Sequence, residues 1–246
     1  MRSASGLGPV QKLRHSATRG LARRGFLVVR HPNVRLQSML TTHGVDVVLD
    51  VGAARGDYAR ELREFGYRGR IVSFEPLHDV FVELEENSAD DPDWTARHMA
   101  LGAEQGEGQI NVASNSDSSS LLGMAEAHSE SAPQVTYVRQ ETIRIEPLDL
   151  VATDLLPPDA RPFLKIDTQG FEHEVLSGAK ETLDRCVGLQ LEVSFVPLYE
   201  GGMLADEAIS YAYDRGFRLV GIERGFTSPS GQVLQADAVF FRIPTG

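Results

Sequence analysis

The sequence predicts a doubly wound α/β domain whose mostly parallel sheet closes on an antiparallel strand pair. An apolar strand at 45–50 leads through a glycine-containing turn, Asp50-Val-Gly-Ala-Ala-Arg-Gly, directly into a helix. Strands and amphipathic helices then alternate along much of the chain, which is typical of a parallel sheet covered by helices. The second strand ends on an acid, Glu75, at the position where such folds bind a ribose.

Length and composition indicate one globular domain. The chain has 246 residues, 41% of them hydrophobic and 24% charged, which is ordinary for a folded protein with a sizeable core. The single cysteine, Cys186, excludes an intrachain disulfide or a thiolate zinc cluster and is interpreted as a core thiol. No apolar run approaches the roughly 20 residues that span a bilayer, so we expect a cytoplasmic protein without a transmembrane segment.

Charge is distributed unevenly along the chain. Residues 1–35 contain eight Arg and Lys and no acid, whereas the remainder contains 16 basic and 35 acidic residues, a net charge of −19. We interpret 1–40 as a basic, partly helical arm that packs on the body or on a second copy in a homodimer, and 41–246 as the catalytic domain. A transit peptide is the alternative for the arm. The acidic body argues against a nucleic-acid substrate.

The turn at 50–56 predicts a nucleoside site. Its glycines allow the backbone to approach a ligand closely, and the following helix offers free N–H groups. The spacing is not Gly-x-Gly-x-x-Gly, so the dinucleotide fingerprint is absent. An acid before the first glycine favours a cationic or hydroxyl-bearing ligand such as S-adenosylmethionine. The residues assigned to its methionine end are Asp50, Gly52, Ala53 and Gly56.

The first half of the domain supplies the rest of the cofactor site. A helix at 57–65 carries Tyr58 on its apolar stripe, where it either flanks the methionine tail or packs in the core. Strand 70–75 is stopped by Pro76, and Glu75 is expected to accept hydrogen bonds from the ribose, with Pro76 beside it. A helix at 79–88 and a strand at 94–101 follow, and Ala100 is expected to edge the adenine.

Residues 102–162 are too long for an ordinary crossover between strands. This segment contains two strand-like pieces, at 109–113 and 135–145, and a serine-rich stretch between them. We interpret it as a substrate-recognition insertion after the third strand, with Ser119 reaching the cofactor pocket. A polar, mobile loop is the alternative.

The second half predicts a strand at 162–167, a helix with one apolar face from Phe171 to Leu183, a strand at 188–196, a helix at 204–215 and a closing pair at 217–223 and 233–242. Glu172 falls inside the apolar face of its helix, so it either points into the crevice or simply complements the helix dipole. His173 lies nearly opposite that face and is a weaker candidate for a base.

Several acids follow or interrupt these later strands. Asp167 ends one strand, and Glu192 and Asp237 lie within apolar strands, where an unpaired carboxylate would be costly to bury. Asp167, Glu192 and Asp237 could together bind Mg²⁺ or Mn²⁺, which prefer oxygen ligands. Without a metal, Asp167 or His173 would be the general base, with Glu172 a further catalytic candidate, and Glu192 would be structural.

Five segments occur in the order found in one family of enzymes. The chain resembles the FkbM family of S-adenosylmethionine-dependent methyltransferases over about residues 45–243, through Asp50-Val-Gly-Ala-Ala-Arg-Gly, Ser73-Phe-Glu-Pro, Ser118-Ser-Ser-Leu, Leu164-Lys-Ile-Asp-Thr-Gln-Gly-Phe-Glu and Pro197-Leu-Tyr-Glu-Gly. The resemblance implies a Rossmann-like sheet of seven strands, the last one antiparallel. It also implies O-methylation, commonly of sugar hydroxyls in glycolipids, polysaccharides or polyketide antibiotics.

The predicted function is therefore methyl transfer from S-adenosylmethionine to a hydroxyl of a small-molecule or glycan acceptor. Two other classes stay open. One is a protein that binds the cofactor without catalysis, such as a scaffold, and the other is a nicotinamide-dependent oxidoreductase.

Overall fold

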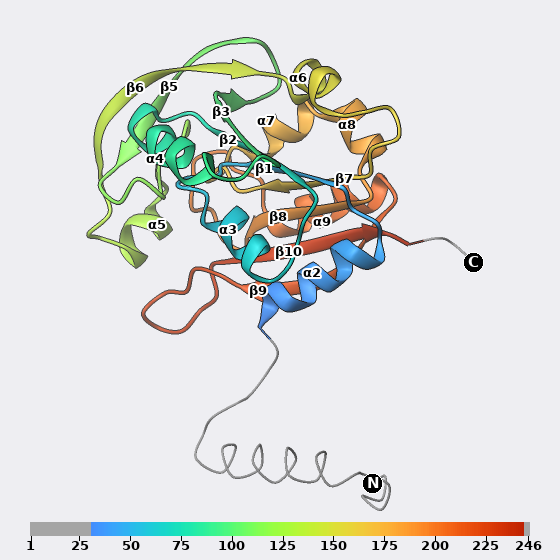
Figure 1. The fold of residues 1–246 in the computed structure, drawn as a ribbon. Coiled ribbons are helices and arrows are strands. Elements are labelled where there is room, and N and C mark those ends of the chain that lie inside the picture. Colours follow the sequence, from blue (N-terminus) through green and yellow to red (C-terminus); the bar gives the residue numbers. More distant parts are fainter. Residues whose placement is uncertain (1–30, 244–246) are drawn as a thin grey trace, which may run out of the picture.

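A computed structural model describes residues 31–243 of the chain. Its main sheet has seven strands in the order β3-β2-β1-β7-β8-β10-β9 (Figure 1). The bounds are β1 Val47–Val51, β2 Arg70–Glu75, β3 Trp94–His98, β7 Pro162–Ile166, β8 Gly188–Ser194, β9 Phe217–Arg224 and β10 Gln235–Arg242. The last strand, β10, runs opposite to the other six and pairs antiparallel with β8 and β9. The predicted α/β fold with an antiparallel last strand is confirmed.

Two layers of helices cover the sheet. The helices α2 (Pro32–Thr42), α3 (Asp57–Glu64) and α4 (His78–Ser88) share one core cluster with the sheet, which includes Leu40, Leu62, Leu84 and Phe163. The opposite face packs against α6 (Leu148–Leu155), α7 (Glu172–Ser177), α8 (Lys180–Arg185) and α9 (Ala205–Asp214). Figure 1 shows α2 on one side of the sheet and α6 and α8 on the other. The carboxyl ends of the parallel strands thus remain open between the layers.

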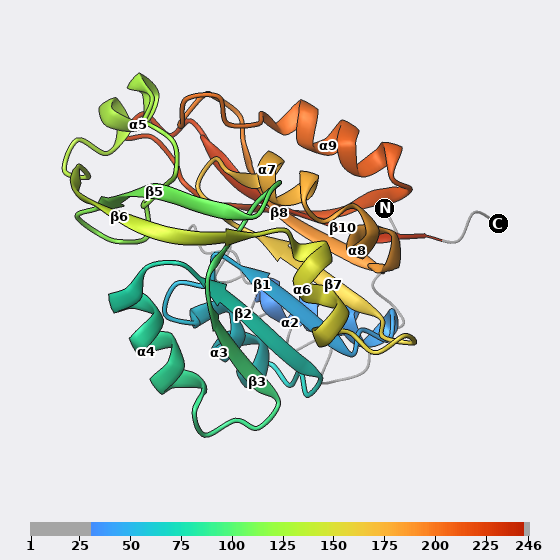
Figure 2. The ribbon, with the colours of Figure 1, turned by 90° about the horizontal axis from the view of Figure 1, so that it is seen from above.

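The predicted insertion folds mostly as a second, smaller sheet. Its strands β4 (Ala100–Leu101), β5 (Gly106–Ala113) and β6 (Tyr137–Glu146) lie in the order β4-β6-β5. Along the chain, α5 (Glu126–Ser131) follows β5 and precedes β6, and Figure 2 shows β5 and β6 side by side. The strand expected at 94–101 is divided, because β3 belongs to the main sheet and β4 to the smaller one. Helix α6 was not predicted from the sequence, and its Leu148, Ala152 and Leu155 pack in the main core.

The helix expected from Phe171 to Leu183 is also divided, into α7 and α8. Gly178 lies at the break, and a Cβ there would come within 2.0 Å of the Gly102 backbone oxygen. This close approach requires a glycine, and apolar periodicity alone does not reveal it. The first 30 residues of the predicted basic arm lie outside the described residues. From residue 31 to residue 243, no helix combines the length and apolar character that crossing a bilayer requires.

Candidate active site

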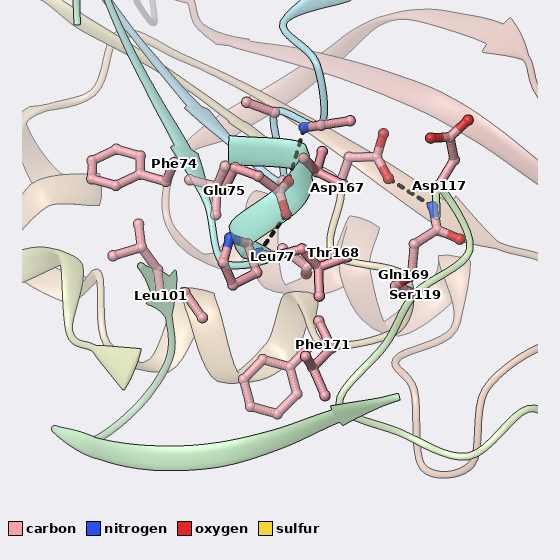
Figure 3. Close-up of a pocket in the computed structure, with 18 of the residues that line it drawn as sticks. Phe74, Glu75, Leu77, Leu101, Asp117, Ser119, Asp167, Thr168, Gln169 and Phe171 are labelled. Atoms are coloured by element: carbon pink, nitrogen blue, oxygen red, sulfur yellow. Dashed lines mark hydrogen bonds between the residues drawn. The ribbon is translucent and has the colours of Figure 1, made fainter. Parts of the chain in front are cut away.

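A cavity of about 290 Å³ opens at the carboxyl ends of β1, β2 and β7 (Figure 3). It is lined by seven of the nine residues predicted to bind the cofactor: Gly52, Ala53, Tyr58, Glu75, Pro76, Ala100 and Ser119. Asp167 lines it as well. The strand ends, the glycine turn and the serine-rich stretch of the insertion therefore meet at one place.

The glycine turn has little room for any other residue. Gly52 has φ +73°, and a Cβ on it would lie 1.8 Å from the backbone oxygen of Asp167. Gly56, which precedes α3, has φ +83°, and a Cβ there would lie 2.5 Å from the Trp94 ring. Positive φ and close backbone approach both select glycine. Gly56 shapes the turn and does not line the cavity, whereas Gly52 brings β1 against the end of β7.

Asp50 lies beneath the cavity and does not line it. Its side chain is fully buried, and its Oδ1 lies 3.2 Å from Lys165 Nζ, an ion pair without hydrogen-bond alignment. Ser73 Oγ donates to Asp50 Oδ2 at 3.1 Å and itself accepts from Trp94 Nε1 at 3.0 Å. Burial by itself would lower the pKa of Lys165, but the Asp50 and Asp167 carboxylates outweigh it and raise that pKa. Asp50 is therefore neutralised by the protein, and its charge is not available to a cationic ligand.

Glu75 does face the cavity, at the end of β2. One carboxylate oxygen accepts the Ala54 N–H at 3.0 Å and the other accepts the Leu77 N–H at 2.9 Å, as the dashed lines in Figure 3 show. Burial raises the pKa of Glu75 to about 7, although these hydrogen bonds lower it in part. The carboxylate is fixed in one orientation and keeps lone pairs for further donors.

Asp167 follows β7 and lies between a cation and an amide. Its Oδ2 is 3.5 Å from Lys165 Nζ, and its Oδ1 accepts from Gln169 Nε2 at 2.8 Å. The same Gln169 nitrogen donates to Glu192 Oε2 at 2.9 Å, and Gln235 Nε2 donates to that oxygen at 2.7 Å. Burial, then the negative charge of Asp167, raises the pKa of Glu192 well above its usual range.

Glu172 and His173 are placed away from the cavity. Glu172 Oε1 accepts the N–H groups of Thr168 at 2.9 Å and Gly170 at 3.1 Å, and the Thr168 hydroxyl at 3.2 Å. It therefore holds the turn between β7 and α7 in shape. His173 is exposed on α7, and neither residue lines the cavity.

The three predicted metal ligands do not form one site. Asp237 lines a second cavity of about 210 Å³ under α2, together with Gln190, whose Nε2 donates to Asp237 Oδ1 at 3.3 Å. Asp167 already accepts an amide donor at Oδ1 and faces the Lys165 ammonium at Oδ2, and Glu192 Oε2 accepts two amide donors. Within residues 31–243 no three His, Cys, Asp or Glu side chains are grouped so that they could hold a metal ion.

Comparison with known proteins identifies this arrangement. A family model described as the methyltransferase FkbM domain matches residues 50–219, from Asp50 in β1 to Leu219 in β9. The chain belongs to the FkbM methyltransferase family. The predicted family is thereby confirmed, as is S-adenosylmethionine as the methyl donor of the class. No curated protein matches the chain.

Solved structures with a similar chain path are distant in sequence. Magnesium protoporphyrin IX methyltransferase from Synechocystis PCC 6803, with bound S-adenosylmethionine, is 9% identical, with 98% of this chain and 87% of that chain covered and a TM-score of 0.47. An rRNA methylase from Streptococcus thermophilus is 13% identical, with coverage of 88% and 99% and a TM-score of 0.46. Fibrillarin from Aeropyrum pernix, also with S-adenosylmethionine, is 12% identical, with coverage of 79% and 66% and a TM-score of 0.44.

Sequence reasoning missed several residues that line the cavity of this FkbM domain. Each of them lies in a segment to which another role had been assigned. Phe74 and Leu101 were expected in the core of strands and Phe171 in the core of a helix. Lys165 and Gln169 lie within family motifs, and Asp117 lies beside the serines. Only Asp117 had a usable local signal, because it lies in the polar stretch already expected to reach the pocket. The aromatic residues gave no such signal, since an apolar residue at the end of a strand or helix is equally compatible with a place in the hydrophobic core.

Arg55 connects the glycine turn of the FkbM domain to the insertion. Its guanidinium pairs with Glu83 at 2.9 Å and Asp117 at 3.0 Å, and donates to Ser116 Oγ at 2.9 Å. Ser116 and Asp117 line the cavity, and Ser116 has φ +58°. Arg55 therefore holds one wall of the cavity against α4.

We expect Arg55→Ala to accelerate release of S-adenosylmethionine several-fold while changing the free energy of unfolding by less than about 1 kcal/mol, because exposed ion pairs contribute little stability. Stopped-flow fluorescence measures the release rate. Arg139→Ala is the matched control, since Arg139 also pairs with two acids, Asp79 and Glu141, and none of the three lines the cavity. An unchanged release rate in Arg55→Ala would show that the wall holds without this contact.

Proposed function

We propose that this protein is an S-adenosylmethionine-dependent O-methyltransferase that acts on a hydroxyl of a sugar, glycolipid, polysaccharide or glycosylated natural product. The observation that carries the proposal is the Asp167 carboxylate, which lines the cavity beside the glycine turn. A sugar hydroxyl is a poor nucleophile at neutral pH and requires a base within hydrogen-bond reach. Asp167 is the residue that we assign to this task.

The cofactor residues follow the cavity wall. Gly52, Ala53 and Tyr58 would lie along the methionine end, Glu75 and Pro76 at the ribose, and Ala100 and Ser119 near the adenine. When bound, S-adenosylmethionine supplies an electrophilic methyl group. The chain's own contribution is to align the acceptor oxygen with that methyl carbon, to exclude water and to receive the hydroxyl proton at Asp167. Asp50, Glu172 and Gly56 would act by holding the strands and turns that carry these groups.

The charges around the cavity favour a neutral acceptor over a phosphorylated one. Among the described residues, the carboxylates of Asp57, Glu75, Asp117 and Asp167 line it, and Lys165 is the lining cation. Lys165 is already neutralised by Asp50 and Asp167. An acceptor rich in phosphates, such as RNA, would meet repulsion here. A cytoplasmic location, a homodimer and recognition of the acceptor by the small sheet stay predictions.

The residues do not fit metal assistance, and we derive no step through a metal. We expect EDTA to change neither the affinity for S-adenosylmethionine nor the rate of methyl transfer by more than about twofold, because amide and ammonium donors already occupy the carboxylates. Calorimetry with and without EDTA measures the affinity, and transfer of labelled methyl groups with and without EDTA measures the rate. A loss of transfer that added Mg²⁺ or Mn²⁺ restores would contradict this expectation.

Mass spectrometry tests the function directly. Extracts of cells that produce the protein, and of cells that lack it, are compared for a glycoconjugate whose mass differs by one methyl group, about 14 Da. The purified protein is then incubated with the lighter species and labelled S-adenosylmethionine. Label on a sugar oxygen supports the proposal. Label on a nucleic acid, or stoichiometric cofactor binding without transfer to any component of the extract, would contradict it.

A further inference from the structure

Gln169 adopts a backbone conformation that its side chain must stabilise. It has φ +56°, in the left-handed region that residues with a Cβ seldom adopt, and it precedes Gly170 at φ +98°. Its backbone oxygen accepts from Ser120 Oγ at 2.7 Å. Strained residues persist where the surrounding contacts over-determine them, commonly beside a reactive site. Here Gln169 lies in the wall of the cavity (Figure 3).

The Gln169 side chain connects three separate parts of the chain. Nε2 donates to Asp167 Oδ1 and to Glu192 Oε2, and Oε1 accepts from the Tyr199 hydroxyl at 2.6 Å. Both amide hydrogens are thus directed at carboxylates that would otherwise repel each other. A side-chain amide suits this position because it carries two donors and an acceptor on a neutral group. Of the acids that Gln169 binds, only Asp167 lines the cavity.

Asp167 is the cavity carboxylate best placed to act on the cofactor's charge. Its backbone oxygen adjoins Gly52, at the end assigned to methionine, where the sulfonium and amino groups of the cofactor would lie. Asp57 is largely exposed, Asp117 is exposed and paired with Arg55, and Glu75 is assigned to the ribose. Lys165 lies between Asp50 and Asp167, so these three groups together keep one net negative charge, and Asp167 is the one of the two acids that lines the cavity. The orientation of Asp167 therefore decides how strongly the site attracts a positive ligand.

We propose that Gln169 is a positioning residue that holds the Asp167 carboxylate against the methionine end of the cofactor site, so that the site favours S-adenosylmethionine over S-adenosylhomocysteine. The substrate carries a positive sulfonium and the product a neutral thioether, and the two are otherwise alike. Discrimination by charge would help to release the product after transfer. The proposal rests on the cofactor site of the proposed function and is independent of the acceptor.

Gln169→Asn tests this directly. Asparagine keeps an amide and tolerates positive φ, but it is one methylene too short to reach both carboxylates. We expect the affinity for S-adenosylmethionine to fall roughly tenfold and that for S-adenosylhomocysteine to fall less than about threefold, because only the former interacts with the displaced charge. Isothermal calorimetry with both ligands gives the ratio of the two dissociation constants. If Gln169 had only a structural role, the substitution would weaken the binding of both ligands equally.

Two further variants keep the test decisive. Asp167→Asn removes the carboxylate charge and leaves Gln169 unchanged, so it should change the ratio of the two dissociation constants in the same way. Adding Gln169→Asn to the Asp167→Asn variant should change this ratio no further. Tyr199→Phe leaves both donors of Gln169 in place and should retain the wild-type ratio. An unchanged ratio in Asp167→Asn, or equal losses for both ligands in Gln169→Asn, would overturn the proposal. Failure of the wild-type protein to bind S-adenosylmethionine at all would instead overturn the cofactor site itself, and this proposal with it.

Discussion

Replacement of Lys165 by methionine is expected to lower the free energy of unfolding by about 3–5 kcal/mol, the cost of leaving one partner of a buried ion pair uncompensated. The Asp50 side chain is fully buried and the Lys165 side chain 7% exposed. Lys165 also donates to the Gly52 backbone oxygen at 3.1 Å. The variant would therefore loosen the glycine turn as well as strand β7. Urea denaturation followed by circular dichroism measures the loss.

Two variants separate this effect from a general intolerance of substitution. Lys180→Met makes the same change at an exposed lysine of α8 and should alter stability by less than about 0.5 kcal/mol. Asp50→Asn combined with Lys165→Met removes both charges, and should be more stable than Lys165→Met alone, since no buried charge is left unpaired. If the double variant is no more stable than the single one, the ion pair is not the source of the loss.

Replacement of Glu75 by glutamine is expected to weaken S-adenosylmethionine binding roughly 10–100-fold at pH 8, because hydrogen bonds from ribose hydroxyls to a carboxylate are stronger than those to an amide. The wild-type affinity should rise as the pH passes through about 7, where Glu75 ionises. The variant should show no such rise. Calorimetry at pH 6 and pH 8 checks both statements, and Glu85→Gln, the same change at an exposed acid of α4 that does not line the cavity, serves as the control. Equal affinities of the variant and the wild type at pH 8 would remove Glu75 from the ribose site.

The same residue predicts how stability depends on pH without a ligand. The pKa of Glu75 is raised in the folded protein, from 4.5 to about 7, mainly by burial. Its contribution to folding is therefore complete below pH 4.5 and is lost as the pH rises through 7, a change of about 3 kcal/mol. Relative to the wild type, Glu75→Gln should gain stability by about this amount between pH 4.5 and pH 7.5. Denaturation of both proteins at the two pH values measures the difference, and a constant difference would contradict the raised pKa.

The parts of the fold that the sequence predicted are those with a local signature. The strands β1, β2, β7 and β8 are short apolar runs bounded by glycine, proline or acids. The glycines at 52 and 56 predict the turn after β1. The predictions failed for α5 and α6, which lie inside the segment 102–162 that was interpreted as strands and loop, and where a distant part of the chain restricts a helix. Gly178 shows the second case, since the backbone of Gly102, 76 residues earlier, leaves no room for a side chain there.

The candidate site divides in the same way. Glu75 and Gly52 could be assigned from their positions at strand ends, and the structure places both at the cavity. The sequence also showed an acid before the first glycine, but not that Lys165, 115 residues later, would neutralise it. Glu172 has the periodicity of an inward residue, and yet its carboxylate is bonded to the turn that precedes it.

By itself, the sequence determined the main strands, the antiparallel closing pair, the glycine turn and the methyltransferase family, because each depends on short motifs that can be recognised locally in the chain. The tertiary structure alone decided which acids face the cofactor. Asp50 lies opposite Lys165 because β1 and β7 are neighbours, and Asp237 lies opposite Glu192 because β10 pairs with β8. Register across strands sets which charges meet, and burial then sets which of them stay available to a ligand.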